Sequence, residues 1–309
     1  MVLDPVTDTP ASAPPPWRRW LPIARVLYLL GAVAILGFLV VRRRDAIGRV
    51  IEDARPAWLA LALLFGFGQL VLNACFWSAA LAALGEPRPT TMVLDSSARS
   101  LLARYIPGSI WYQVGRSVLL IRWGVPRRAV AMVAGLDTAM GVVVGAALGA
   151  VLLAMGAGAP GPVVLIPAVV ALAIACSPPV VNYALRLLAR WRGGEVARID
   201  WPHFLGLLGW MALFWATSAA GFVAYLHAFP RLSLPSVIDV AGSFMVAWVV
   251  GFFVVFAPQG AGVFEATVAG LLTDDALTPV IVIVAGYRAL LLVRDLVAVG
   301  TAAVVSPSR

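Results

Sequence analysis

Seven stretches of this chain are apolar for about twenty residues or longer, and they limit the folds open to it. A membrane-spanning α-helix needs about 20 apolar residues. The stretches are Leu21–Val41, Ala57–Leu84, Ala129–Met155, Val163–Val181, Phe204–His227, Val237–Phe256 and Pro279–Val304. Of the 309 residues, 61% are hydrophobic and 12% charged, which excludes an ordinary soluble core. The pattern predicts an all-α polytopic membrane protein with six or seven transmembrane helices.

The N-terminal end divides into two parts. Residues 1–16 are polar and rich in proline, which predicts a disordered tail. Residues 17–309 are predicted to form a single helical membrane domain. The pair Arg18-Arg19 before the first apolar run resembles a signal peptide, but that run continues well past the cleavage-like residues 32–34. A retained signal-anchor helix is therefore favoured.

Two regions, at about 92–124 and 237–272, are neither loops nor clean spans. In the first, two helical arms of about a dozen residues flank "IPGSIW", and at 1.5 Å per residue neither can cross a core of about 30 Å. A re-entrant hairpin is predicted. In the second, "APQGAG" interrupts an apolar run. Val237–Phe256 either crosses fully or pairs with Val263–Leu272 as a second hairpin. The hairpin is favoured, and it would give an inverted repeat.

Broken helices in two halves of a membrane protein point to a transport site where they meet. Irregular backbone at membrane depth is tolerated only where protein or a water-filled cavity satisfies its amides and carbonyls. The two interrupted regions therefore predict a polar cavity between them.

The chain has 23 basic residues, all arginine, and a net charge of +8. Arginines beside apolar runs orient helices and meet anionic headgroups, so no nucleic-acid partner is expected. With a cytoplasmic N-terminus, that side collects three arginines up to Arg25, seven from Arg88 to Arg128 and four from Arg186 to Arg198, against six on the other side. This count favours that orientation. The exception is residues 42–55, which are predicted to form a helix on the outer surface.

Ionised side chains inside the predicted spans need an explanation, because each costs at least about 2.5–3.5 kcal/mol to insert. They are Asp137, Asp239, Glu265, Arg288, Arg294 and Asp295. Buried ion pairs that fix helix register are one explanation, and a transport site is the other. Arg288 and Asp295 are expected to share one helix face, whereas the adjacent Arg294 and Asp295 are expected not to face each other.

The first break has the chemistry of an anionic headgroup site. The helix that follows it would present free backbone amides, and Arg104 and Arg116 flank it with forked donors suited to phosphate. Tyr105, Trp111 and Tyr112 suit the headgroup level. The alternative is a hairpin at the cytoplasmic interface whose arginines only touch surface lipids.

The second break carries Glu265 in the first turn of the next short helix. A glutamate there either caps free amides or pairs with a cation such as Arg288.

No metal, cofactor or catalytic motif is evident. Cys75 and Cys176 lie in apolar runs, and His203 and His227 are too few for a zinc site. The sequence has no P-loop, HExxH, CxxC or Gly-x-Ser-x-Gly motif. A non-enzymatic protein without cofactors is expected.

The stretch "ARYIPGSIWYQVGRSVLLIRWGVPRRAVAMVAGLD" resembles the signature of the lysylphosphatidylglycerol synthase transmembrane-region family, also called flippase-like domain proteins. The residues that match this pattern are Arg104, Tyr105, Pro107, Gly108, Trp111, Gly115, Arg116 and Asp137. The residues that match the family's second signature are Pro258, Gly260, Gly262, Val263, Glu265, Tyr287 and Arg288. Gln259 and Phe264 depart from it, standing where a glycine and a basic residue are usual.

The resemblance implies a helical membrane domain with two re-entrant elements that moves a lipid between leaflets. In the named enzyme this domain adjoins a soluble synthase domain, and the present chain is expected to act without one. The residues expected to bind substrate are Arg104, Tyr105, Pro107, Gly108, Trp111, Tyr112, Arg116, Asp137, Pro258, Gly260, Gly262, Glu265, Tyr287 and Arg288.

Two functions follow as hypotheses. The first is a flippase or lipid-handling transporter of the bacterial inner membrane, for an anionic or zwitterionic phospholipid or a lipid-linked intermediate. Arg104, Arg116 and Arg288 would bind phosphate, while Asp137 and Glu265 would meet a cationic group or carry a proton. The second is a scaffold that binds such a lipid and presents it to a separate synthase or glycosyltransferase.

Overall fold

The computed structural model describes residues 52–105, 110–156, 177–183, 199–254, 260–272 and 277–305. Every secondary-structure element described there is helical, which confirms the all-α prediction. Several predicted features lie outside the described residues. They are the N-terminal tail, the run Leu21–Val41, most of the surface helix at 42–55 and nearly all of Val163–Val181.

Three of the described helices are long and apolar enough to cross a membrane: α3 (Pro56–Ala83), α6 (Arg127–Met155) and α9 (Trp201–His227). They confirm three predicted spans to within three residues at each end. Local signals set where they begin. Pro56 occupies the first turn of α3, where its missing N–H costs nothing. Asp200 caps α9 by accepting a hydrogen bond from the His203 backbone N–H at 3.1 Å.

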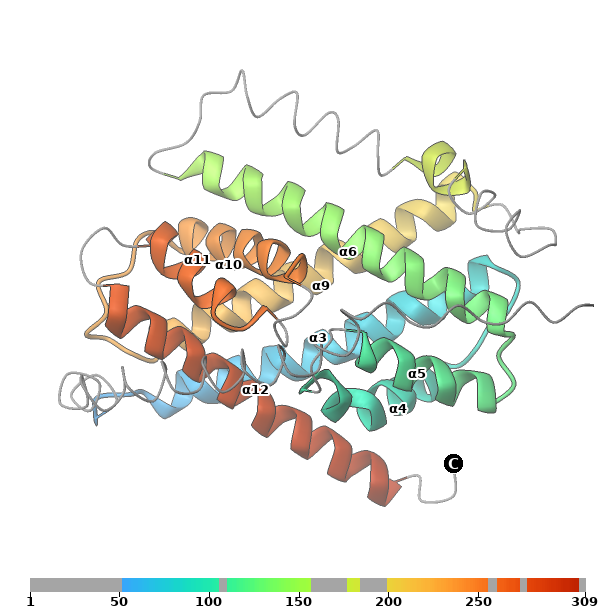
Figure 1. Cartoon of the computed structure of the whole chain (residues 1–309), viewed down its shortest axis with the longest axis horizontal. Helices are drawn as coiled ribbons and strands as arrows, with labels where there is room; N and C mark the ends of the chain where they lie inside the picture. Colours follow the sequence, from blue (N-terminus) through green and yellow to red (C-terminus); the bar gives the residue numbers. More distant parts are fainter. Residues whose placement is uncertain are drawn as a thin grey trace, which may run out of the picture.

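Helices α3 and α9 form an antiparallel pair at the centre of the bundle (Figure 1). The Arg55 N–H, at the start of α3, donates to the Ala228 carbonyl at the end of α9 over 2.9 Å. Helix α6 packs on α9 and on α10 (Val237–Phe252). The Trp215 indole N–H of α9 donates to the Gly141 carbonyl of α6 at 2.9 Å, so a side chain bonds the two helices directly.

The first interrupted region forms α4 (Thr90–Ser100), the 3₁₀ helix η1 (Leu101–Tyr105) and, after the break, α5 (Trp111–Arg122). Helices α4 and α5 have 11 and 12 residues. At 1.5 Å per residue each is below about 20 Å, too short to cross a hydrocarbon core of about 30 Å. The two helices pack against each other and against α3 and α6. The prediction of two short arms is confirmed.

The second interrupted region forms α10 and α11 (Val263–Leu272), which also pack against each other. Helix α10 ends at Phe252, so the apolar run to Phe256 is not one continuous helix. Gly260 and Gly262 in the turn have φ of 67° and 87°, a region that favours glycine. A Cβ on Gly260 would lie 2.6 Å from the Gly251 Cα, so the turn also requires close backbone approach.

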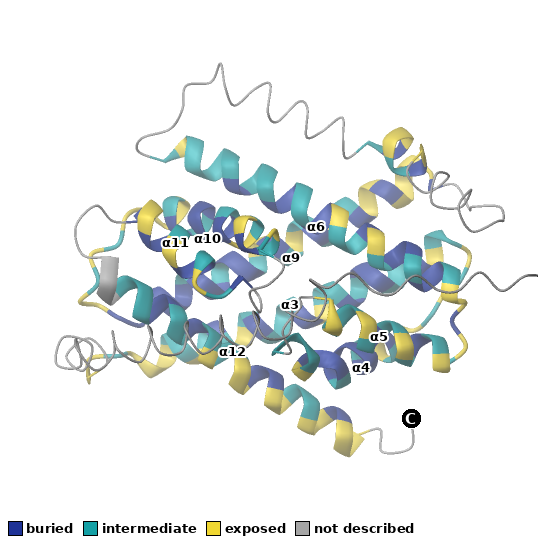
Figure 2. Cartoon of the chain, in the orientation of Figure 1, coloured by how far each residue is buried: buried dark blue, intermediate teal, exposed yellow. Residues whose placement is uncertain are grey.

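The last helix, α12 (Leu277–Val305), crosses the bundle and contacts both interrupted regions (Figure 1). Its N-terminal half packs on α9 and α11. Its C-terminal half packs on α3, α4 and η1. The apolar side chains Leu296, Val297 and Val304 near its C-terminal end are exposed (Figure 2).

An aromatic cluster joins α9, α10, α11 and α12. Phe222 lies 5.0 Å from Phe244 and 5.1 Å from Tyr287, measured between ring centroids. Phe264 of α11 lies 5.9 Å from Phe244. The cluster fixes the position of Tyr287, and therefore of the neighbouring Arg288, relative to the second interrupted region.

Candidate functional site

Asp295 of α12 is the centre of a buried ionic group. The Arg294 Nε and Nη2 atoms donate to its Oδ1 at 2.8 and 2.6 Å. The Tyr105 hydroxyl donates to its Oδ2 at 3.0 Å, and Arg104 Nη1 lies 3.5 Å from the same oxygen. The side chains of Arg294 and Asp295 have no exposed surface. The expectation that these adjacent residues do not face each other is wrong, because the long arginine side chain folds back over its neighbour.

Arg294 also connects α12 to α3. Its Nη1 donates to Gln69 Oε1 at 2.7 Å and to the Gly66 carbonyl at 3.3 Å. Gln69 in turn donates to the Ser218 hydroxyl of α9 at 2.8 Å. A Cβ on Gly66 would lie 3.0 Å from Arg294 Cδ, so the small residue makes room for the guanidinium. We call Gln69, Arg104, Tyr105, Arg294 and Asp295 the Asp295 group.

A second set of polar side chains surrounds Asp137 of α6. Asn73 of α3 donates to Asp137 Oδ1 at 3.0 Å, and Gln113 of α5 donates to Oδ2 at 2.8 Å. Arg116 of α5 does not reach the carboxylate by any hydrogen bond described. Its Nη1 donates instead to Asn73 Oδ1 at 2.7 Å. We call Asn73, Gln113, Arg116 and Asp137 the Asp137 group.

Arg116 is fully buried and only partly satisfied. Its guanidinium lies over the Trp77 ring at 3.8 Å from the centroid. Within the described part of the chain, its Nε and Nη2 atoms have no hydrogen-bond partner. A buried donor left unpaired costs about 1–3 kcal/mol, and more when it is charged. The structure thus holds a costly pair of open donors at this position.

Tyr112 and α3 join the two groups. The Arg104 guanidinium lies 4.7 Å from the Tyr112 ring centroid, and the Arg116 guanidinium lies 5.8 Å from it. Gln69 and Asn73 are four residues apart on α3, so they share one face of that helix. The Asp295 group, Tyr112 and the Asp137 group form a continuous set, which we call the polar chain.

The second interrupted region has its own ion pair. Glu265 Oε2 accepts from the Gly262 N–H at 2.6 Å, while Oε1 is hydrogen-bonded and paired with Arg288 Nε. The Arg288 guanidinium also lies 5.4 Å from the Phe264 ring centroid. Both roles weighed for Glu265 from the sequence, capping and pairing with Arg288, are therefore present together.

The formal charges of these groups do not balance. Arg116 is offset by Asp137, and Arg288 by Glu265. Two guanidinium groups, those of Arg104 and Arg294, share the single carboxylate of Asp295, which leaves the Asp295 group at +1. Arg104 is the charged residue of this group nearest in sequence to the first break. An anion is the ligand that this charge favours.

Several predicted site residues belong to the polar chain: Arg104, Tyr105, Tyr112, Arg116 and Asp137. Gly260, Gly262, Glu265, Tyr287 and Arg288 lie instead at the second interrupted region. Trp111 is 41% exposed. Pro107, Gly108 and Pro258 lie outside the described residues.

Three amide side chains of the polar chain were missed from the sequence, namely Gln69, Asn73 and Gln113. Gln69 and Asn73 could have been found from the sequence, because they are amides four residues apart in the otherwise apolar helix α3 and therefore share one of its faces. Asp239, considered at first among the intramembrane charges, is not part of the polar chain. It bonds Ser236 at the exposed start of α10.

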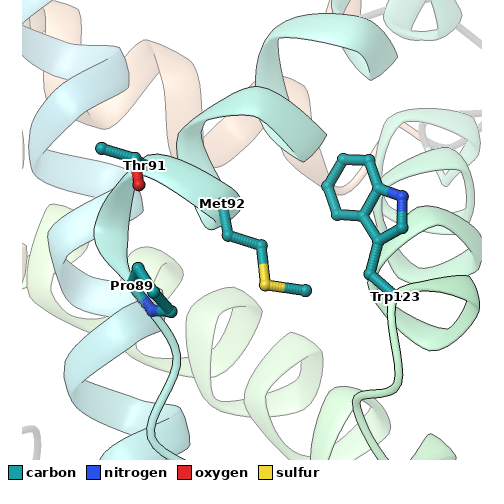
Figure 3. Close-up of a pocket in the computed structure, with 4 residues that line it drawn as sticks. All are labelled: Pro89, Thr91, Met92 and Trp123. Atoms are coloured by element: carbon teal, nitrogen blue, oxygen red, sulfur yellow. The ribbon is translucent and has the colours of Figure 1, made fainter. Parts of the chain in front are cut away.

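Two cavities lie apart from the polar chain. One of about 300 Å³ is lined by Pro89, Thr91, Met92 and Trp123, where α4 begins and α5 ends (Figure 3). The other, of about 530 Å³, is apolar and lies along α3, α6, α9 and α10. Over the ranges that the structure describes, no three His, Cys, Asp or Glu side chains gather as a metal site would require.

Comparison with known families identifies a match over most of the chain. The family model described as the lysylphosphatidylglycerol synthase TM region matches residues 23–293. The matched range includes the Asp137 group and the Glu265–Arg288 pair, and it ends directly before Arg294 and Asp295. No curated protein matches the chain.

Proposed function

Because the chain belongs to the lysylphosphatidylglycerol synthase transmembrane-region family, we propose that it moves a lipid between the two leaflets of a bacterial inner membrane. The substrate is an anionic or zwitterionic phospholipid or a lipid-linked intermediate. The protein does not alter this lipid chemically. Membership of this family and the three long apolar helices support a role in the membrane connected with lipids.

The observation that carries the proposal is the polar chain. Its charged and amide side chains come from α3, η1, α5, α6 and α12, and two of these helices, α3 and α6, are long and apolar enough to cross a membrane. A headgroup crossing the hydrocarbon core alone would lose its hydration, at a cost of several kcal/mol. Side chains that replace water along part of the path lower this cost, while the acyl chains remain in the bilayer.

The arginines have different roles in this proposal. Arg104 and Arg116 bind the phosphate at the first interrupted region, and the net positive charge of the Asp295 group attracts it. Arg288 meets the headgroup at the second interrupted region, and Asp137 and Glu265 interact with a cationic part of the headgroup or carry a proton. The two interrupted regions are re-entrant hairpins that enter from opposite faces. Rocking of one half against the other alternates access.

The positions of the helix ends support the proposed orientation in the membrane. The C-terminal end of α3 and the N-terminal end of α6 face the same side of the membrane if the α4–α5 pair enters and returns. Arg88, Arg122 and Arg127 cluster between these ends in the sequence. By the positive-inside rule this side is cytoplasmic, so α3 begins on the opposite side. The predicted span Leu21–Val41, which precedes α3 in the sequence, would then return the N-terminus to the cytoplasmic side.

Lipid movement by the purified protein tests the proposal. The protein is reconstituted into liposomes with a fluorescent phosphatidylglycerol analogue, and the fraction accessible to a membrane-impermeant quencher is followed over time. Transport predicts that more than half of the analogue becomes accessible, with loss of this effect in Arg104→Ala and Arg288→Ala. If the wild-type protein binds the analogue but leaves its accessibility at the protein-free level, the chain is a scaffold and the transport proposal is wrong.

A further inference from the structure

The guanidinium of Arg116 differs from those of the other arginines of the site in which of its nitrogen atoms have hydrogen-bond partners. A guanidinium offers donors along fixed edges, and the edge formed by Nε and Nη2 can bind two oxygens of one anion in parallel. In Arg116 both of these atoms lack a partner within the described residues, whereas Nη1 is held by Asn73 at 2.7 Å. The edge suited to two-oxygen recognition is therefore the edge left open.

The nearest carboxylate is kept away from this edge by Asn73. The Asn73 amide accepts from Arg116 through Oδ1 and donates to Asp137 through Nδ2 at 3.0 Å. Gln113 occupies the other oxygen of Asp137 at 2.8 Å. Asp137 thus offsets the charge of Arg116 through an intervening amide without occupying its donors. At the other arginines the carboxylate contacts the guanidinium itself: Asp295 lies against Arg104 and Glu265 against Arg288.

We infer that the Nε–Nη2 edge of Arg116 binds the two non-bridging oxygens of a phosphodiester headgroup. Asn73 is a positioning residue that keeps the Asp137 carboxylate from occupying these two donors. This inference rests on the proposed function. Gln113 Oε1, also buried and without a partner in the described structure, can accept a hydrogen bond from a donor elsewhere on the same headgroup. Trp77 supports the flat face of the guanidinium at 3.8 Å.

Arg116 is buried, so binding at its Nε–Nη2 edge requires a movement of α5. Its side chain has no exposed surface. A lipid headgroup therefore reaches this edge only if α5 moves away from α6, on which it packs, or from Asn73 and Trp77 of α3, which the guanidinium contacts. An unpaired buried donor costs free energy, and an anion bound there would recover it.

Calorimetric titration of the purified full-length protein tests the assignment. The probes are dihexanoyl phosphatidylglycerol, inorganic phosphate and decanoate. Arg116→Lys keeps the charge but removes the two-donor edge, so it should weaken the phosphatidylglycerol affinity at least tenfold. Arg122→Lys, at an exposed position of the same helix, is the matched control and should stay within twofold of wild type. Equal affinities for wild type and Arg116→Lys would overturn the assignment.

A second pair of variants tests the role of Asn73 and does not require replacement of Arg116. In Asn73→Ala the carboxylate of Asp137 can move onto the open edge, so the affinity should fall. In Asn73→Ala with Asp137→Asn the competing charge is gone, and the affinity should return to within about threefold of wild type. Unchanged affinity in Asn73→Ala would show that Asn73 is not needed as a spacer. Each variant is checked for native elution and helical content.

The probes also separate the possible ligands. If inorganic phosphate binds and its binding is lost in Arg116→Lys, the same edge of Arg116 binds phosphate from a soluble ligand. If decanoate binds as tightly as dihexanoyl phosphatidylglycerol, the site does not prefer a phosphodiester, and the assignment is contradicted. The proposed function would fail by a different result. If phosphatidylglycerol binding depends on Arg116 but the protein does not move lipid between leaflets, the site assignment stands and the transport proposal is wrong.

Discussion

Replacing Asp295 by asparagine is expected to destabilise the protein strongly, because its carboxylate is the only acidic partner described for two guanidinium groups. Arg294 donates to it through two nitrogens, and Arg104 lies 3.5 Å from it. Neither Asp295 nor Arg294 has exposed side-chain surface, so water cannot replace the lost charge. The substitution preserves size and leaves Arg294 buried without a counter-ion.

The expected loss is about 3–5 kcal/mol of unfolding free energy, the usual cost of removing one partner from a buried ion pair. A matched control is Asp53→Asn, which breaks the ion pair between Asp53 and Arg231. These side chains lie 2.5 Å apart but are 46% and 48% exposed. Exposed pairs contribute at most about 1 kcal/mol. The two aspartates therefore differ in burial rather than in the kind of partner.

Equilibrium unfolding measures the difference. The purified protein in dodecylmaltoside micelles is titrated with sodium dodecyl sulfate while its helical circular dichroism is recorded. A third variant, Arg294→Met with Asp295→Leu, removes the two fully buried charges. It should cost less than Asp295→Asn alone, because an apolar pair needs no counter-ion and the remaining Arg104 side chain is 20% exposed to solvent. Arg294→Met and Asp295→Leu are also measured singly.

The reasoning is refuted if Asp295→Asn costs no more than Asp53→Asn. It is also refuted if the double substitution costs as much as the sum of its two single substitutions, because the charges would then act independently.

Three further substitutions address the packing. Gly260→Ala should lower the unfolding free energy by about 1–3 kcal/mol in the same titration, because it places a side chain at φ 67° and against Gly251. A loss below about 0.5 kcal/mol, the size expected for a neutral surface substitution, would contradict this prediction. Phe222→Ala should lose about 3–5 kcal/mol by opening a cavity in the aromatic cluster, measured as a lower thermal midpoint. Trp215→Phe should lose about 1 kcal/mol, since it removes the hydrogen bond to the Gly141 carbonyl; unchanged stability would show that this bond does not hold α6 to α9.

The long helices within the described residues were predictable because a single property, the length of an apolar run, determines them. The predicted run Ala129–Met155 became α6 at Arg127–Met155, and the break before Glu265 was located from its glycines. These signals are local in the sequence. The extra residues at the helix starts reflect a first turn that extends into polar sequence, which hydropathy does not register.

The site was predictable in its charges but not in its contacts. Arg116 and Asp137 were both chosen, yet Asn73, which lies between them, is 43 and 64 residues away from them in sequence. A neutral amide in an apolar helix gives a weak signal, and its partners depend on how three helices pack. Arg294 and Asp295 were misjudged for another reason. Helix geometry places adjacent Cβ atoms apart, but the length of an arginine side chain overcomes that separation.

Helix α12 holds the two interrupted regions by contacts on one of its faces. Arg288 meets Glu265 near one end and Asp295 meets Tyr105 seven residues later, a separation of about 10 Å along the axis. A helix is stiff over two turns, so a tilt that brings Asp295 closer to η1 draws Arg288 away from Glu265. Loosening of one contact would then accompany tightening of the other. If the chain moves lipids as proposed, this opposition would keep one interrupted region closed while the other opens, without any separate closing segment.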